Sequence, residues 1–469
     1  MSQAVRIEID SMGPVELPAD AYYGAQTARA AANFQLSSLR MPRRFIAALG
    51  LVKAAAARAN SALGLLDARL GTAIEQAALE VAEGRFDSQF IVDVFQTGSG
   101  TSTNMNANEV IANRAIELLG GARGDKSLVH PNDHVNMGQS SNDVFPTAMH
   151  IAALVAVETH LLPALRHLAA VLADKAHEFA DVVKAARTHL RDAVPITLGQ
   201  EFSGYATAVA HAAERIEGTR GHLAELAIGG TAVGTGLTAH PAFAARVIGE
   251  LRALTGQMFR RAENPFEALQ NRDAAVALAG ACRGVAVAFM KIANDLRLLS
   301  SGPLSGLDEI TLPALQPGSS VMPGKVNPVV PEAVNMAAAQ VIGHDAAIAV
   351  SGLNGNLDLN TMMPIIAYDL LDSVELLSAA ARGLADRCIV GITANRARCL
   401  SYADRSPAVI TALAPVIGYD AAAALVQHAI AEGRSIRDVV AESGLAPPER
   451  LAEVFDLLAL TRGGRPAAP

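Results

Sequence analysis

Long alanine- and leucine-rich runs with helical periodicity, separated by clusters of glycine and proline, dominate this sequence. Alternating apolar and polar residues, the pattern of a half-buried strand, are nearly absent. The pattern predicts five long helices: Pro146 to about Ala186, the Thr197–Gln200 capping box to Gly229, about Phe266 to Ser300, a helix that begins at Asn327–Pro328, and Met363–Pro364 to about Cys388. Helices of about 25 to 35 residues are about 40–50 Å long and pack as bundles, so the fold is predicted to be mostly α.

The ends of these helices and the rest of the chain carry weaker signals. Asn142 and Asp143 are the cap candidates of the first helix, a kink is expected at Pro163, and Asn327 is expected to cap the fourth helix. Residues 6–15 are expected to form a small strand pair, and residues 463–469 a disordered tail. Three domains are predicted, at residues 1–140, 141–395 and 396–469.

The amino-acid composition excludes several classes of protein and partner. Only 18% of the residues are charged, against about 25% in typical proteins, which indicates burial between subunits. The net charge of −8 and the lack of a basic run exclude nucleic acid as an expected partner. No stretch of about 18 apolar residues is free of charge, so no membrane span is expected.

The cysteines and the first residues favour a cytoplasmic location. Cys282, Cys388 and Cys399 are odd in number and form no C-x-x-C pair, which supports neither a disulfide framework nor a zinc site. The first residues lack the basic and apolar segments of a secretory signal. We expect three inert buried thiols and no metal site.

The segment Gly318–Pro328, Gly-Ser-Ser-Val-Met-Pro-Gly-Lys-Val-Asn-Pro, has the composition of an anion-binding loop. It leads into a helix, where free N–H groups and the helix dipole favour negative charge, and Lys325 and Asn327 add a cation and an amide. It is not an ATP-binding P-loop, because the glycine spacing is one residue too long and Val326 stands where that motif needs Ser or Thr.

Three further polar islands lie between the apolar helices: Thr97–Asn106, His130–Asp133 with Gln139–Asn142, and Arg187–His189. Any one of them could merely cap a helix. Together with a lysine and a histidine they favour a site, in which Glu332 would orient and charge His189. Gly234–Ala239 matches a dinucleotide-binding pattern but follows a helical segment, so it is interpreted as a turn.

These segments resemble a known family. Gly318–Pro328 closely resembles the signature loop of the class II fumarase/aspartase superfamily, and four other segments are similar to its remaining blocks in the family's order: Thr97–Asn106, His130–Asn142, Arg187–His189 and Gly229–Leu237. The resemblance covers roughly Arg6 to Gly433. It implies a three-domain, mostly α fold with a central five-helix bundle, and a homotetramer with a twenty-helix core whose active sites form where three subunits meet.

The resemblance also implies the chemistry. Members add or remove a group across the double bond of fumarate-like dicarboxylates without a cofactor or metal, and fumarases act in the tricarboxylic acid cycle. Ser319 would be the base that removes a carbon-bound proton to give an aci-carboxylate, and His189, paired with Glu332, would handle the water. The implied substrate-binding residues are Ser99, Gly100, Thr101, Ser140, Ser141, Asn142, Thr188, Ser320, Lys325, Val326 and Asn327. A secondary dicarboxylate site would comprise His130, Pro131, Asn132 and Asp133.

The residues that distinguish fumarases from aspartases within the family do not all favour the same reaction. Ser140–Asn142, Met322–Lys325, His240–Pro241 and Asn264–Leu269 resemble fumarases, whereas Thr101–Asn108, Asp133–Asn136 and Pro328–Glu332 are closer to aspartases. Hydration of fumarate to (S)-malate is the leading hypothesis, and aspartate ammonia-lyase is the alternative. A non-catalytic scaffold, as in the related lens proteins, would not need Ser319, His189, Glu332 and Lys325 together.

Two residues depart from the family pattern. Leu304 replaces a usual arginine, and Ser127 stands where some fumarases have an arginine beside the secondary site, which puts that site in doubt.

Overall fold

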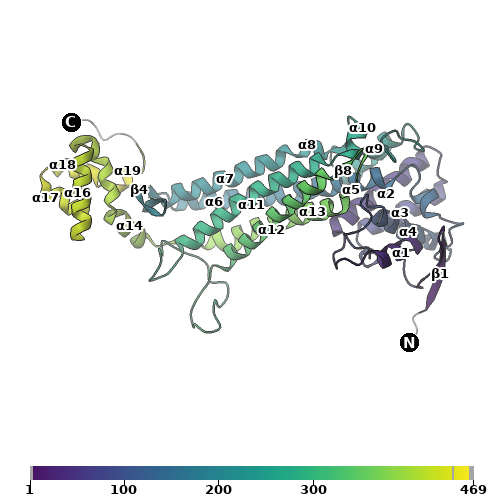
Figure 1. Cartoon of the computed structure of the whole chain (residues 1–469), viewed down its shortest axis with the longest axis horizontal. Coiled ribbons are helices and arrows are strands. Elements are labelled where there is room, and N and C mark those ends of the chain that lie inside the picture. Colours follow the sequence, from purple (N-terminus) through teal and green to yellow (C-terminus); the bar gives the residue numbers. More distant parts are fainter. Residues whose placement is uncertain (1–3, 446–447, 464–469) are drawn as a thin grey trace. The chain divides into compact units, whose positions relative to one another are not determined.

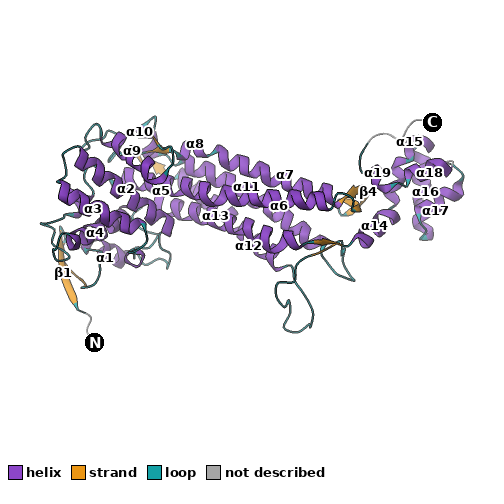
Figure 2. Cartoon of the chain, turned by 180° about the vertical axis from the view of Figure 1, so that it is seen from behind, coloured by secondary structure: helices purple, strands orange, loops and turns teal. Residues whose placement is uncertain are grey.

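A computed structural model describes residues 4–445 and 448–463 (Figure 1). Helices form most of the chain, and within these residues the strands form five two-stranded sheets (Figure 2). The predicted mostly α fold is therefore confirmed. Most of the predicted disordered tail, residues 464–469, lies outside the described residues.

The chain divides into two compact units. Unit 1 comprises Met1–Pro163, Glu214–Ala286 and Ala338–Ser378, and unit 2 comprises Ala164–Ala213, Val287–Ala337 and Ala379–Pro469. Among the described residues, five helices contribute residues to both units: α6 (Leu162–Glu178), α7 (Leu198–Gly218), α11 (Asp273–Leu299), α12 (Val329–Leu353) and α13 (Met363–Gly383). The boundaries at residues 140 and 395 remain a prediction.

Unit 1 begins with the expected strand pair. β1 (Val5–Asp10) and β2 (Gly13–Pro18) are antiparallel. The following helices are α1 (Ala25–Asn33), α2 (Arg43–Ala62), α3 (Ala68–Ala82) and α4 (Thr101–Leu118). The unit also holds α8 (Arg220–Leu223), α9 (Phe243–Thr255), α10 (Pro265–Gln270), the parallel pair β5 (Glu225–Leu226) and β6 (Arg260–Arg261), and the pair β8 (Gly355–Asn356) and β9 (Leu359–Asn360).

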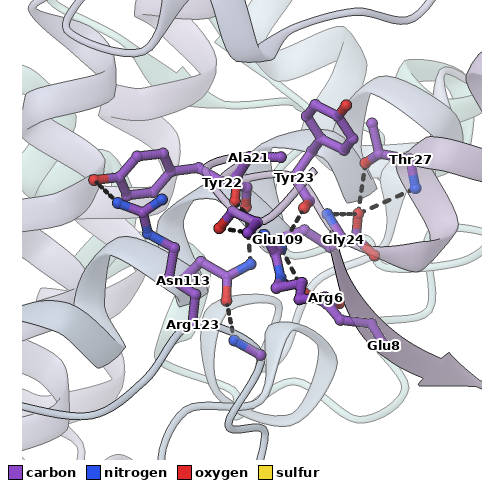
Figure 3. Close-up of polar contacts among 12 residues, drawn as sticks. Arg6, Glu8, Ala21, Tyr22, Tyr23, Gly24, Thr27, Glu109, Asn113 and Arg123 are labelled. Carbon is purple, nitrogen blue, oxygen red and sulfur yellow. Dashed lines mark hydrogen bonds and ion pairs between the residues drawn. The ribbon is translucent and has the colours of Figure 1, made fainter. Parts of the chain in front are cut away.

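A buried carboxylate organises the segment between β2 and α1 (Figure 3). Glu109 of α4 accepts the N–H groups of Gly24, Gln26 and Thr27 and the hydroxyl of Thr27. These N–H groups belong to the start of α1 and have no partner within the helix. Arg6 donates to nearby carbonyl oxygens, including that of Tyr23, and so holds the same segment against β1.

The first long helix differs from its prediction at both ends. α5 (Ser141–Ala156) continues through a π-helical segment, Val157–Leu161, into α6 (Leu162–Glu178). The predicted start at Pro146 is wrong, because a capping box of Ser140 and Asp143 begins the helix earlier. The predicted end near Ala186 is also wrong, because β3 (Val183–Thr188) pairs with β4 (Arg191–Thr197). The β-branched Val182–Val183 pair favours the strand.

The other long helices follow the predicted pattern with local corrections. The capping box at Thr197 and Gln200 is present, but α7 ends at Gly218 instead of Gly229. The third helix is interrupted between α10 and α11. The predicted cap at Asn327 is not formed: the side-chain amide donates to the carbonyl of Gly318, and among the described residues no N–H of α12 donates to Asn327 Oδ1. The fifth helix is confirmed as α13 (Met363–Gly383) with a π-helical extension, Leu384–Cys388.

Side chains join the long helices within each unit. In unit 2, Tyr205 of α7 donates to Asp295 of α11 at 2.7 Å, and Asn335 of α12 donates to Asn294 of α11 at 2.8 Å. In unit 1, Arg283 of α11 pairs with Asp345 of α12 at 2.6 Å. The fully buried stripe of α11 has helical spacing: Leu278, Cys282, Val285, Phe289, Ile292 and Leu296. These contacts hold neighbouring helices together inside each unit.

The remaining elements of unit 2 are short. β7 (Ile310–Thr311) pairs with β10 (Thr393–Ala394). The helices after it are α14 (Arg396–Arg405), α15 (Ala414–Ile417), α16 (Tyr419–Glu432), α17 (Ile436–Ser443), α18 (Pro448–Val454) and α19 (Leu457–Leu460), which surround a small apolar core.

Within the described residues, three helical segments have the length and apolar composition to cross a membrane: Ser141–Glu178, Asp273–Leu299 and Val329–Leu353. Large apolar side chains on α11 and α12 are exposed in the single chain, including Val287, Met336 and Leu353. A membrane or other protein chains could cover such faces. The absence of a membrane partner therefore stays a prediction. The three cysteines are buried as expected.

The capping box of α7 provides a test of this local structure. Thr197→Ala removes the hydroxyl that accepts the Gln200 N–H, so we expect a loss of about 1 kcal/mol in the free energy of unfolding. Thr197→Ser retains the hydroxyl and should lose less. Thermal unfolding of the two variants measures the difference, and equal midpoints would contradict the capping role.

Candidate active site

Three hydroxyl groups of unit 1 lie in one hydrogen-bonded chain. Thr101 Oγ1 is 2.8 Å from Ser99 Oγ and 2.7 Å from Ser141 Oγ. Thr101 begins α4 and Ser141 begins α5, so two helix N-termini contribute to this cluster. Gly100 has a φ of 74°, and a Cβ there would overlap the ring of Phe145. Hydroxyls and helix N-termini together suit a carboxylate.

The turn before α5 is held from two sides. Ser140 Oγ accepts the N–H of Asn142 at 3.2 Å, and Asp143 Oδ1 accepts the N–H of Ser140 at 2.9 Å. The Asn142 amide donates to the carbonyl of Ala232 at 2.8 Å. The predicted residues Ser99, Thr101 and Ser140–Asn142 are thus brought together within unit 1.

The predicted secondary site lies on a π-helical turn, Pro131–Val135. His130 Nδ1 accepts the N–H groups of Asn132 and Asp133 at 3.2 and 3.1 Å. Ser127 is exposed and donates its hydroxyl to Asp125. The site remains a prediction.

His189 lies at the tip of the β3–β4 hairpin. His189 and Leu190 have φ values of 55° and 57°. Both turn residues are therefore left-handed, as in the tight turns that match strand twist, although neither is glycine. Such conformations cost about 1–2 kcal/mol per residue. Thr188 and His189 are exposed.

Ion pairs inside unit 2 hold the base of this hairpin. Glu309 is fully buried, and its carboxylate binds Arg187 at 2.9 and 3.1 Å and Lys184 at 3.0 Å. Lys184 also pairs with Glu201 of α7 at 2.6 Å. Burial acts to lower the pKa of Arg187, but the hydrogen bonds that Arg187 donates to Glu309 and the nearby negative charges outweigh burial, so the pKa is raised above its usual value. These partners stabilise the strand that ends in Thr188 and His189.

The Gly318–Pro328 loop closes on itself. The N–H of Gly318 donates to the carbonyl of Lys325 at 2.8 Å, and a Cβ on Gly318 would lie 2.6 Å from that oxygen, so glycine is required. Ser319 Oγ accepts the N–H groups of Val321 and Met322 at 3.1 and 2.8 Å. Two N–H donors on one hydroxyl oxygen would stabilise negative charge on it. Ser320, Lys325 and Val326 are exposed, and Asn327 is half-buried.

Comparisons with known proteins agree with these blocks. A family model described as Lyase matches residues 13–343, and one described as Fumarase C C-terminus matches residues 409–462. "Fumarate hydratase class II" of Thermosynechococcus vestitus is 54% identical, with 97% of each chain covered. The chain belongs to the class II fumarase family of lyases.

Another relative and a solved structure support this membership of the class II fumarases. "Fumarate hydratase class II" of Halobacterium salinarum is 53% identical, covering 99% of this chain and 98% of its own. The crystal structure of the class II fumarase from Schistosoma mansoni superposes with a TM-score of 0.95 at 41% identity, covering 98% of this chain and 99% of its own. The predicted family and its fold are confirmed.

The residues predicted for the site belong partly to unit 1 and partly to unit 2. Unit 1 holds Ser99–Thr101 and Ser140–Asn142, and unit 2 holds Thr188–His189, the Gly318–Pro328 loop and Glu332. Among the described residues, no hydrogen bond or ion pair joins His189 to Glu332, which is exposed in the first turn of α12. Their pairing and the roles of the site residues therefore stay predictions.

No group of three or more His, Cys, Asp or Glu side chains suited to a metal occurs in the part of the chain that the structure describes. Sequence reasoning overlooked Glu309, whose arginine partner is 122 residues away. Nothing local distinguishes it from a surface carboxylate. Asp143 was considered only as a cap candidate, and its sequence position beside Ser140–Asn142 was the available signal.

Removing the Glu309 carboxylate tests the support of the hairpin. Glu309→Ala leaves two cations without their shared buried partner, so we expect a loss of about 3–5 kcal/mol in the free energy of unfolding. Glu375→Ala is the control, because Glu375 pairs with Arg44 at the surface, where such a pair contributes less than about 1 kcal/mol. Thermal unfolding compares the variants, and equally small shifts would contradict the supporting role.

Proposed function

We propose that this chain catalyses the reversible hydration of fumarate to (S)-malate. The observation that carries the proposal is the geometry of Ser319, whose Oγ accepts two backbone N–H groups inside the loop that resembles the fumarase signature. The names of the class II relatives support the same reaction.

Ser319 is proposed as the base in the direction from malate to fumarate. Its alkoxide takes the C3 proton, and the electron pair moves into the adjacent carboxylate to give an aci-carboxylate. The electron pair of the aci-carboxylate then forms the C2–C3 double bond as the C2–O bond breaks, and the hydroxyl leaves as water with a proton from His189. The N–H groups of Val321 and Met322 lower the free energy of the alkoxide before the proton is taken.

Two sets of donors are proposed to bind the substrate carboxylates. The hydroxyls of Ser99, Thr101 and Ser141 already lie in one chain at helix N-termini and suit one carboxylate. Lys325 and Asn327 add a cation and an amide near Ser319. The intermediate carries more negative charge than the substrate, so such donors stabilise the transition state more strongly than the ground state.

A homotetramer is proposed to complete the site. His189 and Glu332 are exposed and unpaired with each other in one chain, so another subunit would supply the partner of each. The exposed apolar side chains of α11 and α12, such as Val287 and Met336, would be buried between subunits. The proposal includes a cytoplasmic location, action in the tricarboxylic acid cycle, and no requirement for metal, nucleic acid or membrane.

A side-by-side assay tests the reaction. Purified protein given fumarate near neutral pH should lower the absorbance of the conjugated diacid as malate forms. The alternative, aspartate ammonia-lyase activity, is less favoured by the relatives' names, and L-aspartate should release little ammonia. Ammonia release much faster than hydration would replace this proposal with the alternative.

Ser319→Ala tests the base. We expect turnover to fall by a factor of about 10² to 10⁴, the contribution typical of a positioned acid or base. Thermal unfolding and the size of the assembly, measured by light scattering, should remain unchanged because Ser319 lies in a surface loop. Ser305→Ala, at an exposed serine outside the site, is the control. Near-full turnover of Ser319→Ala would exclude it as the base.

A further inference from the structure

Asp143 is a buried carboxylate to which the proposed reaction assigns no step. Its side chain is fully buried in unit 1, in the first turn of α5. Oδ1 accepts the N–H of Ser140 at 2.9 Å, and Oδ2 accepts the N–H groups of Gly229 and Thr231 at 3.0 and 2.8 Å. One carboxylate therefore joins the turn before α5 to a loop about 90 residues later, at separations of 86 and 88 residues along the chain.

The loop that Asp143 holds has an unfavourable backbone. Gly229 has a φ of 88°, and a Cβ there would lie 2.5 Å from the Cβ of Ala244. Thr231 is buried and left-handed, with a φ of 54°, although it is β-branched. Such a conformation persists only where the surroundings over-determine it. The two N–H bonds to Asp143 supply that constraint.

The same loop sets the direction of a proposed substrate-binding side chain. The Asn142 amide donates to the carbonyl of Ala232, the residue after Thr231, at 2.8 Å. The loop and the turn before α5 are thus held together by three hydrogen bonds. Displacing the loop would turn the Asn142 amide, and releasing the Ser140 N–H would move the hydroxyl of Ser141.

Buried Lys53 completes the surroundings of Asp143. Its ammonium donates to Asn136 Oδ1 at 2.9 Å and to Gln139 Oε1 at 3.0 Å, directly before Ser140. Burial raises the pKa of Asp143 to about 7, although the three N–H groups and the charge of Lys53 act in the opposite direction. The carboxylate faces backbone donors inside the protein.

We propose that Asp143 is a positioning residue of the substrate-carboxylate site, which fixes the Ser140–Asn142 turn against the Gly229–Ala232 loop without touching the substrate. This inference rests on the proposed function. Positioning requires both side-chain oxygens of Asp143 to accept hydrogen bonds, because N–H donors approach from the turn and from the loop. An amide of the same size cannot replace it, since its NH₂ group would face either the Ser140 N–H or the loop N–H groups.

Asp143→Asn tests the inference against a matched control. Glu109→Gln makes the same change at another buried carboxylate of unit 1, which accepts three backbone N–H groups and a hydroxyl at the start of α1, outside the site (Figure 3). Both variants should unfold at lower temperature than the parent chain. Only Asp143→Asn should raise the KM for fumarate, by about tenfold or more, since carboxylate hydrogen bonds depend on geometry.

The turnover number separates positioning from catalysis. The kcat of Asp143→Asn should stay within about threefold of the parent, because Ser319 and His189 lie outside the turn. The upward shift of the unfolding temperature by added fumarate should shrink in Asp143→Asn and persist in Glu109→Gln. An unchanged KM in Asp143→Asn, or an equal rise in both variants, would overturn the inference.

Two further results keep the outcomes distinct. Asp143→Glu keeps both acceptor oxygens, so it should recover part of the fumarate-induced shift of the unfolding temperature. A shift no larger than in Asp143→Asn would contradict the inference. If Asp143→Asn fails to fold, Asp143→Glu is compared with the parent chain in its place. If the parent chain binds fumarate without hydrating it, the proposed reaction fails, while the shift still tests Asp143. If the parent does not bind fumarate, both proposals fail.

Discussion

Burial of long apolar helix faces is the constraint on which the rest of this structure depends. The buried stripe of α11, from Leu278 to Leu296, is packed in the apolar interior. A polar side chain in this stripe would need a buried hydrogen-bond partner. Several of the predicted site residues lie instead at places where helices begin. The hydroxyls of Thr101 and Ser141, the Gly318–Pro328 loop and Glu332 all lie at such ends.

Buried carboxylates then hold these helix ends in place. Glu109 and Asp143 each accept several backbone N–H groups, and Glu309 binds two cations beneath the hairpin. An unpaired buried donor costs about 1–3 kcal/mol, so each carboxylate stabilises a turn that apolar packing alone leaves unspecified. The strained residues Thr231 and His189 lie in segments that Asp143 and Glu309 hold.

The predicted contacts that the structure confirms join residues that are close in sequence. The capping box at Thr197 and the β1–β2 pair were predictable, because their partners lie within a few residues. The predicted start of α5 at Pro146 treats proline as a helix boundary, whereas Ser140 and Asp143 form the cap and the helix begins before the proline. The end of α6 was misplaced because alanines after Val183 continued the helical pattern, whereas pairing with β4 decided the strand.

The sequence by itself determined the mostly α fold, the family and the chemical character of the Gly318–Pro328 loop, because periodicity, caps and a contiguous motif are local properties. Only the tertiary structure decided which buried carboxylates hold the turn before α5 and the β3–β4 hairpin, and that His189 adopts a left-handed conformation. Asp143 and Gly229 are 86 residues apart, and Arg187 and Glu309 are 122 apart. Each of these interactions depends on how the helices between the two residues pack, and the residues next to them in sequence do not indicate that packing.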